Sequence, residues 1–227
     1  MYGSGAGAVQ IRKGVCLCIA TAANLRMLRP DLSFRFVWMG HGYNPEHDNA
    51  YSVYVAAQIE QASLGESFAI LDAVEDMEPA YANADAFFMC SRLDPQPNVG
   101  IDAVTRGIPT VCFKGSSGTA EVLQSNDATR GLVAPYLDVH AAAKIICHLA
   151  NNRAERPVLS EAVSTVGARF YKMDRYIHHI EELGLEASSQ DHREDLALVL
   201  DAGIVDPEMA IAANCPIPYE GLERSVI

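Results

Sequence analysis

Short apolar runs alternate with amphipathic stretches along most of the 227-residue chain. The apolar runs are bounded by turn residues and predict strands at 5–9, 34–40, 67–71, 86–90, 109–113 and 131–135. Between them, apolar residues at helical spacing predict helices at 13–28, 50–63, 98–106, 119–125 and 139–151, and a helical turn at 78–84. Two more helices are predicted at 156–170 and 173–184.

This rhythm predicts an α/β fold. Continuous apolar strands between helices are typical of a parallel sheet that is covered on both faces. We therefore expect one doubly wound, Rossmann-like sheet of about six strands within residues 1–185. The remaining residues, 186–227, are expected to form an acidic helical tail.

The charge of the chain is negative and unevenly spread. The formal net charge is −12, and the segment from Glu181 to the end holds 11 acids and 2 bases, a net of −9. No dense cluster of Lys and Arg is present, so nucleic acid is not an expected partner. No apolar run approaches the roughly 20 residues of a membrane span.

The cysteines favour a reducing compartment. None of the six forms a CxxC pair, and most lie inside apolar runs: Cys16, Cys18, Cys90, Cys112, Cys147 and Cys215. We interpret them as reduced core thiols of a cytoplasmic protein, which is either free or peripheral at the inner membrane surface. No spacing of histidines, acids and cysteines predicts a metal site.

Two cations stand where the first strand meets the first helix. Arg12 and Lys13 oppose the helix dipole at a helix start, which costs stability unless an anion neutralises them. Guanidinium, ammonium and backbone N–H groups together make a phosphate clamp. Two solvated surface charges would explain the same dipeptide.

Two carboxylates flank a stiff turn in the stretch "DPQPNVGID". Asp94 follows an apolar strand, Asn98 is the expected N-cap of the next helix, and Asp102 falls about one turn into that helix. Both acids are expected to point into one crevice and to accept hydrogen bonds from sugar hydroxyls. The alternative is that Asp94 is a turn residue and Asp102 only compensates the helix dipole.

A flexible loop, "KGSSGTAEVL", follows the next strand. Such a loop can approach a phosphate closely, so Ser117, Gly118, Thr119 and Glu121 are candidate contacts. The loop lacks the GK[ST] of a Walker A motif, and no GxGxxG follows the first strand. A dinucleotide-dependent dehydrogenase is therefore disfavoured.

In order and spacing, these segments resemble the C-terminal, donor-binding half of a GT-B glycosyltransferase of family 4. The shared features are "RKG", two acids separated by seven residues, "DAVTRGIPTV", "GSSGTAEVL" and "GLVAP". The resemblance extends over roughly residues 5–183. It implies a retaining enzyme that moves a hexose from a nucleotide-sugar to a glycan or lipid-linked acceptor in cell-surface polysaccharide synthesis.

The resemblance also implies residue roles. Arg12 and Lys13 would hold the donor diphosphate. Asp94 would act as the catalytic residue that binds hydroxyls of the transferred sugar, and Asp102 would bind the ribose. The backbone around Asn98, Val99 and Gly100 would touch sugar or phosphate, and the loop that holds His41 would lie near the base. No cofactor and no metal are expected, because cationic side chains neutralise the leaving group.

The chain departs from the family pattern in several places. Both acids are Asp where the family usually has Glu, Pro97 replaces a usual glycine, and Ala8 stands where an Arg is usual. An acceptor-binding domain before Met1 is also missing, so we expect an incomplete fragment that is inactive alone. The alternatives are a non-catalytic nucleotide-sugar-binding or interaction domain of a larger protein, and a GT-B nucleotide-sugar epimerase.

Overall fold

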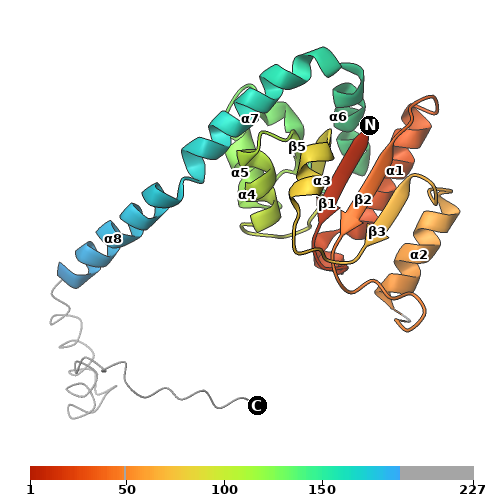
Figure 1. Cartoon of the computed structure of the whole chain (residues 1–227), viewed down its shortest axis with the longest axis horizontal. Coiled ribbons are helices and arrows are strands. Elements are labelled where there is room, and N and C mark those ends of the chain that lie inside the picture. The colour runs from red at the N-terminus through yellow and green to blue at the C-terminus, as the bar shows by residue number, and fades with distance from the viewer. Residues whose placement is uncertain (49, 190–227) are drawn as a thin grey trace, which may run out of the picture. The chain divides into compact units, whose positions relative to one another are not determined.

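Six parallel strands form one sheet, as expected from the sequence, in a computed structural model that describes residues 1–48 and 50–189 (Figure 1). The strand order is β3-β2-β1-β4-β5-β6, with every neighbouring pair parallel. The strands are β1 (Tyr2–Ala6), β2 (Arg35–Met39), β3 (Phe68–Leu71), β4 (Ala86–Met89), β5 (Thr110–Phe113) and β6 (Val133–Ala134).

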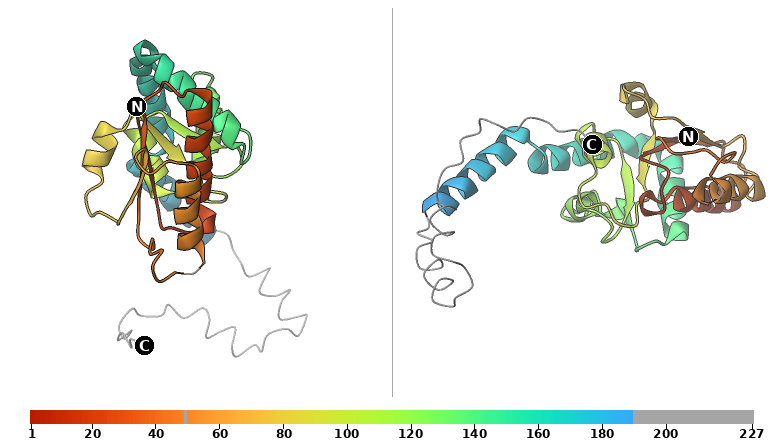
Figure 2. Two further views of the ribbon diagram at one scale, coloured as in Figure 1. Left: turned by 90° about the vertical axis from the view of Figure 1, so that its right-hand side faces the viewer. Right: turned by 90° about the horizontal axis from the view of Figure 1, so that it is seen from below.

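Helices cover both faces of the sheet (Figures 1 and 2). On one face, α1 packs against both α2 and α6. On the other, α7 packs against α4 and α5, and α3 lies beside β1 and α4. The helices are α1 (Val15–Leu28), α2 (Tyr51–Gln61), α3 (Glu78–Asn83), α4 (Asn98–Thr105), α5 (Gly118–Gln124), α6 (Val139–Asn151), α7 (Arg156–Phe170) and α8 (Met173–Ser189).

The first strand lies three residues earlier than the sequence pattern predicts. The expected strand at 5–9 is wrong, because β1 spans Tyr2–Ala6. A Cβ on Gly3 would lie 2.7 Å from the Phe36 ring, and one on Gly5 would lie 2.9 Å from the Trp38 ring. Small residues in β1 therefore make room for large aromatic residues of β2, so the strand carries little hydrophobic signal of its own.

The sheet reverses its winding direction between β1 and β4. Strand β1 pairs with β2 on one side and with β4 on the other, and the chain runs outward from this pair in both directions. In such sheets, ligands bind at the carboxyl ends of the strands where the order reverses. The loops that follow β1 and β4 are therefore the first place to look for a site.

The start of α4 corrects one expectation. Pro97, not Asn98, is the N-cap, and Asn98 is the first helical residue. Pro97 has an extended backbone (φ −73°, ψ 124°), and its carbonyl accepts from the amides of Gly100 and Ile101 at 2.9 and 3.1 Å. The proline thus opens the helix by backbone geometry, without a side-chain cap.

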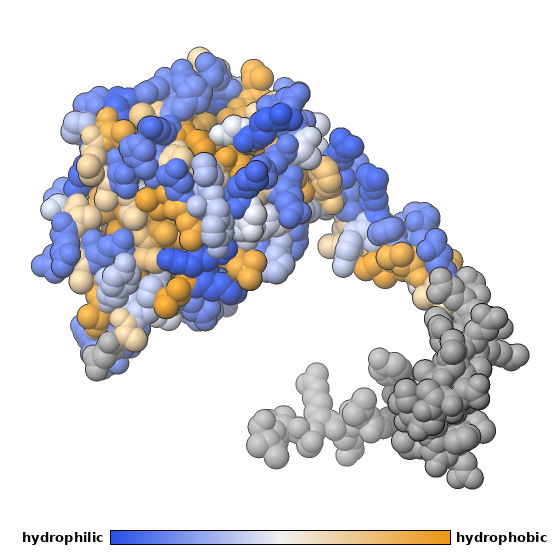
Figure 3. Space-filling view, turned by 180° about the vertical axis from the view of Figure 1, so that it is seen from behind, coloured by the Kyte–Doolittle hydropathy of each residue, from blue (hydrophilic) through white to orange (hydrophobic). Residues whose placement is uncertain are grey.

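The chain divides into two units, Met1–Lys172 and a second that begins at Met173. Of the second unit the structure describes α8, whose exposed apolar side chains gather on one side (Figure 3). The boundary expected at 185 falls inside this helix, and most of the expected tail, 190–227, lies outside the described residues. None of the described helices is both long and apolar enough to cross a bilayer.

The described cysteines are free thiols, as the sequence led us to expect. Cys16, Cys18, Cys90 and Cys112 are buried, and Cys147 is half-buried. Burial, followed by the neighbouring thiol of Cys90, raises the pKa of Cys18. Cys215 lies outside the described residues.

Candidate functional site

Loops that are about 80 residues apart in the sequence meet at the carboxyl ends of β1 and β4. The segment after β1 holds a short 3-10 helix, Ile11–Lys13, and the segment after β4 runs from Cys90 to Pro97. The amide of Arg92 donates to the carbonyl of Arg12 at 2.8 Å. This backbone bond fixes the first predicted segment against the second.

Gly14 allows this close approach. It adopts a left-handed backbone (φ +80°) at the junction of the 3-10 helix and α1. A Cβ at this position would lie 2.0 Å from the carbonyl oxygen of Cys90. Only glycine combines this φ with so short a distance between the two loops.

Arg12, Lys13 and Asp94 form a cluster of two cations around one buried carboxylate. The Lys13 ammonium is in direct contact with Asp94 Oδ2, and Arg12 Nη1 lies 3.2 Å from Asp94 Oδ1. The Asp94 side chain is 10% exposed and that of Lys13 is 18% exposed. The hydroxyl of Ser91 also donates to the Asp94 carboxylate at 3.4 Å.

Two cations and one carboxylate give this cluster one net positive charge. Arg12 is half exposed, so its guanidinium can reach water or a ligand. A carboxylate has about four acceptor positions, so Asp94 can accept further hydrogen bonds while it holds both cations. The arrangement suits an anion that carries hydroxyl groups nearby.

Arg92 is the residue that the sequence did not single out. Its guanidinium donates to the carbonyl of Ile11 at 2.5 Å and to the Cys16 sulfur at 3.3 Å. The hydroxyl of Tyr136 donates to the carbonyl of Arg92 at 3.2 Å. Arg92 thus connects the 3-10 helix to the loop after β4. The one sequence signal for this role is that Arg92 lies two positions before Asp94.

Asp102 does not join the cluster around Asp94. Its carboxylate lies 3.2 Å from Arg106 Nη1, one turn further along α4, and its side chain is 48% exposed. Arg106 also pairs with Glu78 of α3 at 2.9 Å. Burial, and then the charge of Asp102, raises the pKa of Tyr81 in α3 to about 12. The two acids expected in one crevice therefore have separate partners.

The first turn of α4 packs closely against Thr119 of α5 and Met89 of β4. Gly100 is buried, and a Cβ there would lie 2.8 Å from Thr119 Oγ1 and 2.9 Å from the Met89 sulfur. Asn98 is exposed and Val99 is half-buried. The structure places all three at the helix start, as the sequence predicts.

The loop after β5 joins the site through the backbone. The amide of Asp94 donates to the carbonyl of Ser116 at 2.8 Å, and that of Gly118 donates to the carbonyl of Pro95 at 2.7 Å. Ser117 is the N-cap of α5, where its hydroxyl accepts from an amide at 3.2 Å. The Thr119 hydroxyl is buried without a partner among the described residues.

Two further candidates are exposed. Glu121 lies in the first turn of α5 and its side chain is in solvent. His41 is also exposed, and its carbonyl accepts from the amide of Val9 at 2.9 Å, so the loop after β2 borders the loop after β1. Within the part of the chain that the structure describes, no group of three or more metal-ligating side chains comes together.

The comparisons with known proteins agree with this fold. The sequence profile described as "Glycosyl transferases group 1" matches residues 5–152. No curated protein sequence matches the chain. Similar solved structures include Anabaena Alr3699/HepE in complex with UDP, at a TM-score of 0.70 and 17% identity over 82% of this chain and 48% of that one.

Two other solved structures have the same fold at similar scores. TarM gives a TM-score of 0.69 at 16% identity, covering 80% of this chain and 34% of that chain. The sucrose-phosphate synthase of Thermosynechococcus elongatus gives 0.68 at 18% identity, covering 83% of this chain and 46% of that chain. The chain thus spans about half, or less, of these proteins, and its fold is that of a single GT-B half.

Proposed function

Because the chain belongs to the group 1 glycosyl transferases, we propose that it is the donor-binding half of a retaining hexosyltransferase. The proposed donor is a nucleotide-sugar, and the acceptor a glycan or lipid-linked sugar in cell-surface polysaccharide synthesis in the cytoplasm. The observation that carries the proposal is the cluster of Arg12, Lys13 and buried Asp94 at the carboxyl edge of the sheet. Structures of the similar HepE hold UDP and UDP-glucose, which supports a nucleotide-sugar here.

The two cations suit a diphosphate. Without a ligand, Asp94 is the partner of Lys13 and Arg12. A bound diphosphate brings more negative charge than this one carboxylate, so it competes with Asp94 for both cations. When the bond from the anomeric carbon to the diphosphate oxygen breaks, the electron pair goes to the diphosphate. Lys13 and Arg12 then stabilise the charge of that leaving group, and we expect no metal requirement.

Asp94 is proposed to bind the transferred sugar. As the diphosphate takes over its cations, the carboxylate becomes free to accept hydrogen bonds from sugar hydroxyls. Asp94 is held in place by its backbone bond to Ser116 and by the hydroxyl of Ser91. The sugar would therefore lie between the loop after β4 and the loop after β5.

Transfer is proposed to need a second lobe. The acceptor hydroxyl attacks the anomeric carbon on the face from which the diphosphate leaves, and its proton passes to the departing diphosphate oxygen. This step requires an orienting wall that excludes water. The chain covers 48% of HepE, and we propose that an N-terminal acceptor-binding domain supplies the rest. Alone, the chain should bind the donor weakly and release nucleoside diphosphate well below about 1 per second.

Calorimetry with UDP, GDP and dTDP tests the binding step. We expect Lys13→Ala to weaken the best ligand by about 1 to 3 kcal/mol, the range for charge-assisted hydrogen bonds. Lys144→Ala is the matched control, because Lys144 is an exposed lysine of α6. Equal affinity of Lys13→Ala and Lys144→Ala would contradict the phosphate role.

The same titration tests Asp102. If Asp102 releases Arg106 to bind a ribose, Asp102→Asn weakens UDP more than it weakens pyrophosphate. Equal losses would contradict the ribose role. Binding without any transfer, after the chain is joined to an acceptor lobe, would favour a non-catalytic binding domain.

A further inference from the structure

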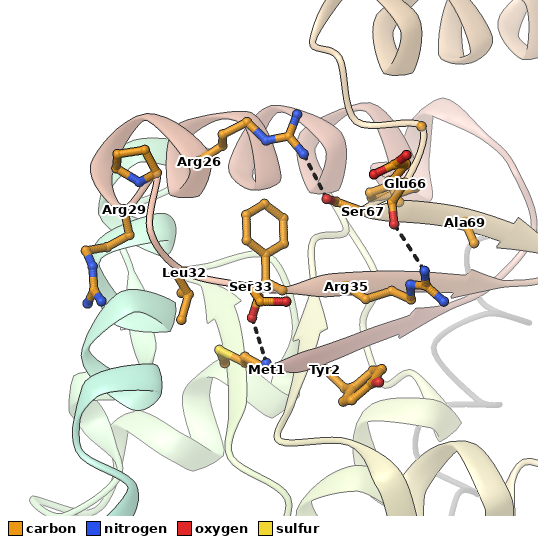
Figure 4. A pocket seen from close by; sticks show the side chains of 14 residues that line it. Met1, Tyr2, Arg26, Arg29, Leu32, Ser33, Arg35, Glu66, Ser67 and Ala69 are labelled. Carbon is orange, nitrogen blue, oxygen red and sulfur yellow. Dashed lines mark hydrogen bonds between the residues drawn. The ribbon is translucent and has the colours of Figure 1, made fainter.

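A second hollow lies at the opposite edge of the sheet from the candidate site. Its volume is about 1080 Å³, and it opens between the amino ends of β1, β2 and β3 and the end of α1 (Figure 4). Arg26, Arg35, Ser33, Glu66 and Ser67 contribute polar groups to its wall. We name this hollow the amino-edge cavity.

Two arginines of the cavity wall donate to neutral oxygens, and the guanidinium of Arg26 also lies 5.9 Å from the centre of the Phe34 ring. The guanidinium of Arg26 donates to the carbonyl of Ser63 and to the Ser67 hydroxyl, the latter at 2.8 Å. Arg35 Nη2 donates to the carbonyl of Glu66 at 3.3 Å. Neither arginine forms an ion pair with a described carboxylate, and each guanidinium has five N–H donors, so several remain for a ligand.

The third arginine of the wall is already neutralised. Arg29 forms a two-pronged pair with Asp31, at 2.8 and 2.7 Å, and also donates to Asn151 of α6. In Figure 4 its side chain turns away from Arg26 and Arg35. Of the three arginines in the wall, Arg26 and Arg35 are therefore the two without a carboxylate partner among the described residues.

The charge of the cavity opposes that of the chain. The lining includes Glu66 as its one carboxylate, and no ion pair joins Glu66 to a described arginine. Two unneutralised guanidiniums thus face one hollow on a chain whose net charge is −12. Two guanidiniums in one hollow repel each other, and an anion bound between them offsets this repulsion because it attracts both.

We propose that the amino-edge cavity binds a phosphate group, either inorganic or carried as a monoester on a small soluble molecule. A phosphate carries about 1.5 to 2 negative charges near neutral pH, which balances two arginines. The guanidinium fork matches phosphate oxygens geometrically, and the hydroxyls of Ser33 and Ser67 are further donors. Ligand pockets of small molecules commonly reach about 1,000 Å³, so the cavity has room for an organic part.

The test is an NMR titration of the full chain with inorganic phosphate and, separately, with glycerol 3-phosphate, at pH 8. Lys13→Ala serves as the background, so that anion binding at the carboxyl edge is weakened, and shifts of residues 33–35 and 65–67 report the amino-edge cavity separately. We expect saturable shifts of the amides of residues 33–35 and 65–67. Tighter binding of glycerol 3-phosphate assigns the site to a phosphorylated molecule, whereas equal affinities assign it to inorganic phosphate.

Variants decide whether the arginines are responsible. We expect Arg35→Ala to weaken phosphate at least about tenfold, as for loss of a charge-assisted hydrogen bond, whereas Lys144→Ala leaves the affinity unchanged. Arg35 is exposed, and among the described residues its side chain makes one hydrogen bond, so its replacement should not unfold the chain. Absence of saturable shifts at these amides, or equal affinity in Arg35→Ala and Lys144→Ala, would overturn the proposal. Neither result bears on nucleotide binding near Lys13.

Discussion

Asp94→Asn tests whether the buried carboxylate stabilises the fold through its two cations. The substitution keeps the side chain's size and removes its charge. It leaves Lys13, whose side chain is 18% exposed, without a counter-charge. Removing one partner of a buried ion pair lowers the free energy of unfolding by about 3 to 5 kcal/mol.

The expected loss is at the lower end of this range. Arg12 is 49% exposed, and water can take over much of its solvation when the carboxylate is removed. We therefore expect the free energy of unfolding to fall by about 3 kcal/mol. For a chain of this size, that corresponds to a Tm lower by roughly 6 to 12 °C.

The assay is thermal and urea unfolding of the full chain, with and without pyrophosphate. Asp102→Asn is the matched control, because Asp102 is 48% exposed and pairs with Arg106 on the surface. A surface pair of this kind contributes about 0 to 1 kcal/mol. Pyrophosphate should raise the Tm of Asp94→Asn more than that of the wild type, since Lys13 is then free to bind it.

One result would refute this reasoning. If Asp94→Asn and Asp102→Asn lower the free energy of unfolding equally, the contacts of Asp94 with Lys13 and Arg12 do not stabilise the fold. The site would then be a set of solvated charges, and the argument for a diphosphate clamp would lose its physical basis.

Three further predictions concern Gly14, Asp85 and the thiols. Gly14→Ala should destabilise the chain by well over about 2 kcal/mol in urea unfolding, through a left-handed φ and a carbonyl 2.0 Å from the new Cβ. Gly115→Ala has a similar φ with nothing within 4 Å and should cost only about 1 to 2 kcal/mol; equal losses would contradict the clash. Burial opposes ionisation of Asp85, but an amide hydrogen bond and a nearby arginine outweigh it and lower the pKa of the carboxyl. Its stabilisation is therefore present above about pH 4 and lost as the pH falls through the lowered folded pKa, so Asp85→Asn should flatten acid unfolding curves measured by circular dichroism. Burial raises the pKa of the Cys112 thiol to about 12, so peptide mapping after iodoacetamide treatment at pH 8 should find Cys147 modified and Cys112 intact in the folded chain.

Local patterns in the sequence were sufficient for most of the fold. The apolar runs of β2, β4 and β5 mark fully or largely buried strands, and the helices at 139–151 and 156–170 are found with the bounds that helical periodicity predicts. These elements could be predicted because burial on the sheet faces sets their residue types directly. The alternation of such strands with helices leaves a parallel sheet as the natural arrangement.

Part of the candidate site could also be predicted. The sequence identified Arg12, Lys13 and Asp94 individually, because cations at a helix start and an acid after a buried strand are visible locally. That Lys13 contacts Asp94, 81 positions away, follows from the adjacency of β1 and β4, which the strand order decides. The sequence pattern predicted that Asp102 shares a crevice with Asp94. In the structure, the Asp102 carboxylate is exposed on α4 and pairs with Arg106, one turn further along the helix.

The remaining features depend on neighbours that only the tertiary structure supplies. β1 is a strand of small residues because Phe36 and Trp38 of the next strand fill the space above Gly3 and Gly5. Arg92 links two loops through carbonyl and sulfur acceptors, which carry no pattern in the sequence. Local residue types determine which segments become strands and helices, whereas distances between segments far apart in the chain arise only once the sheet has formed.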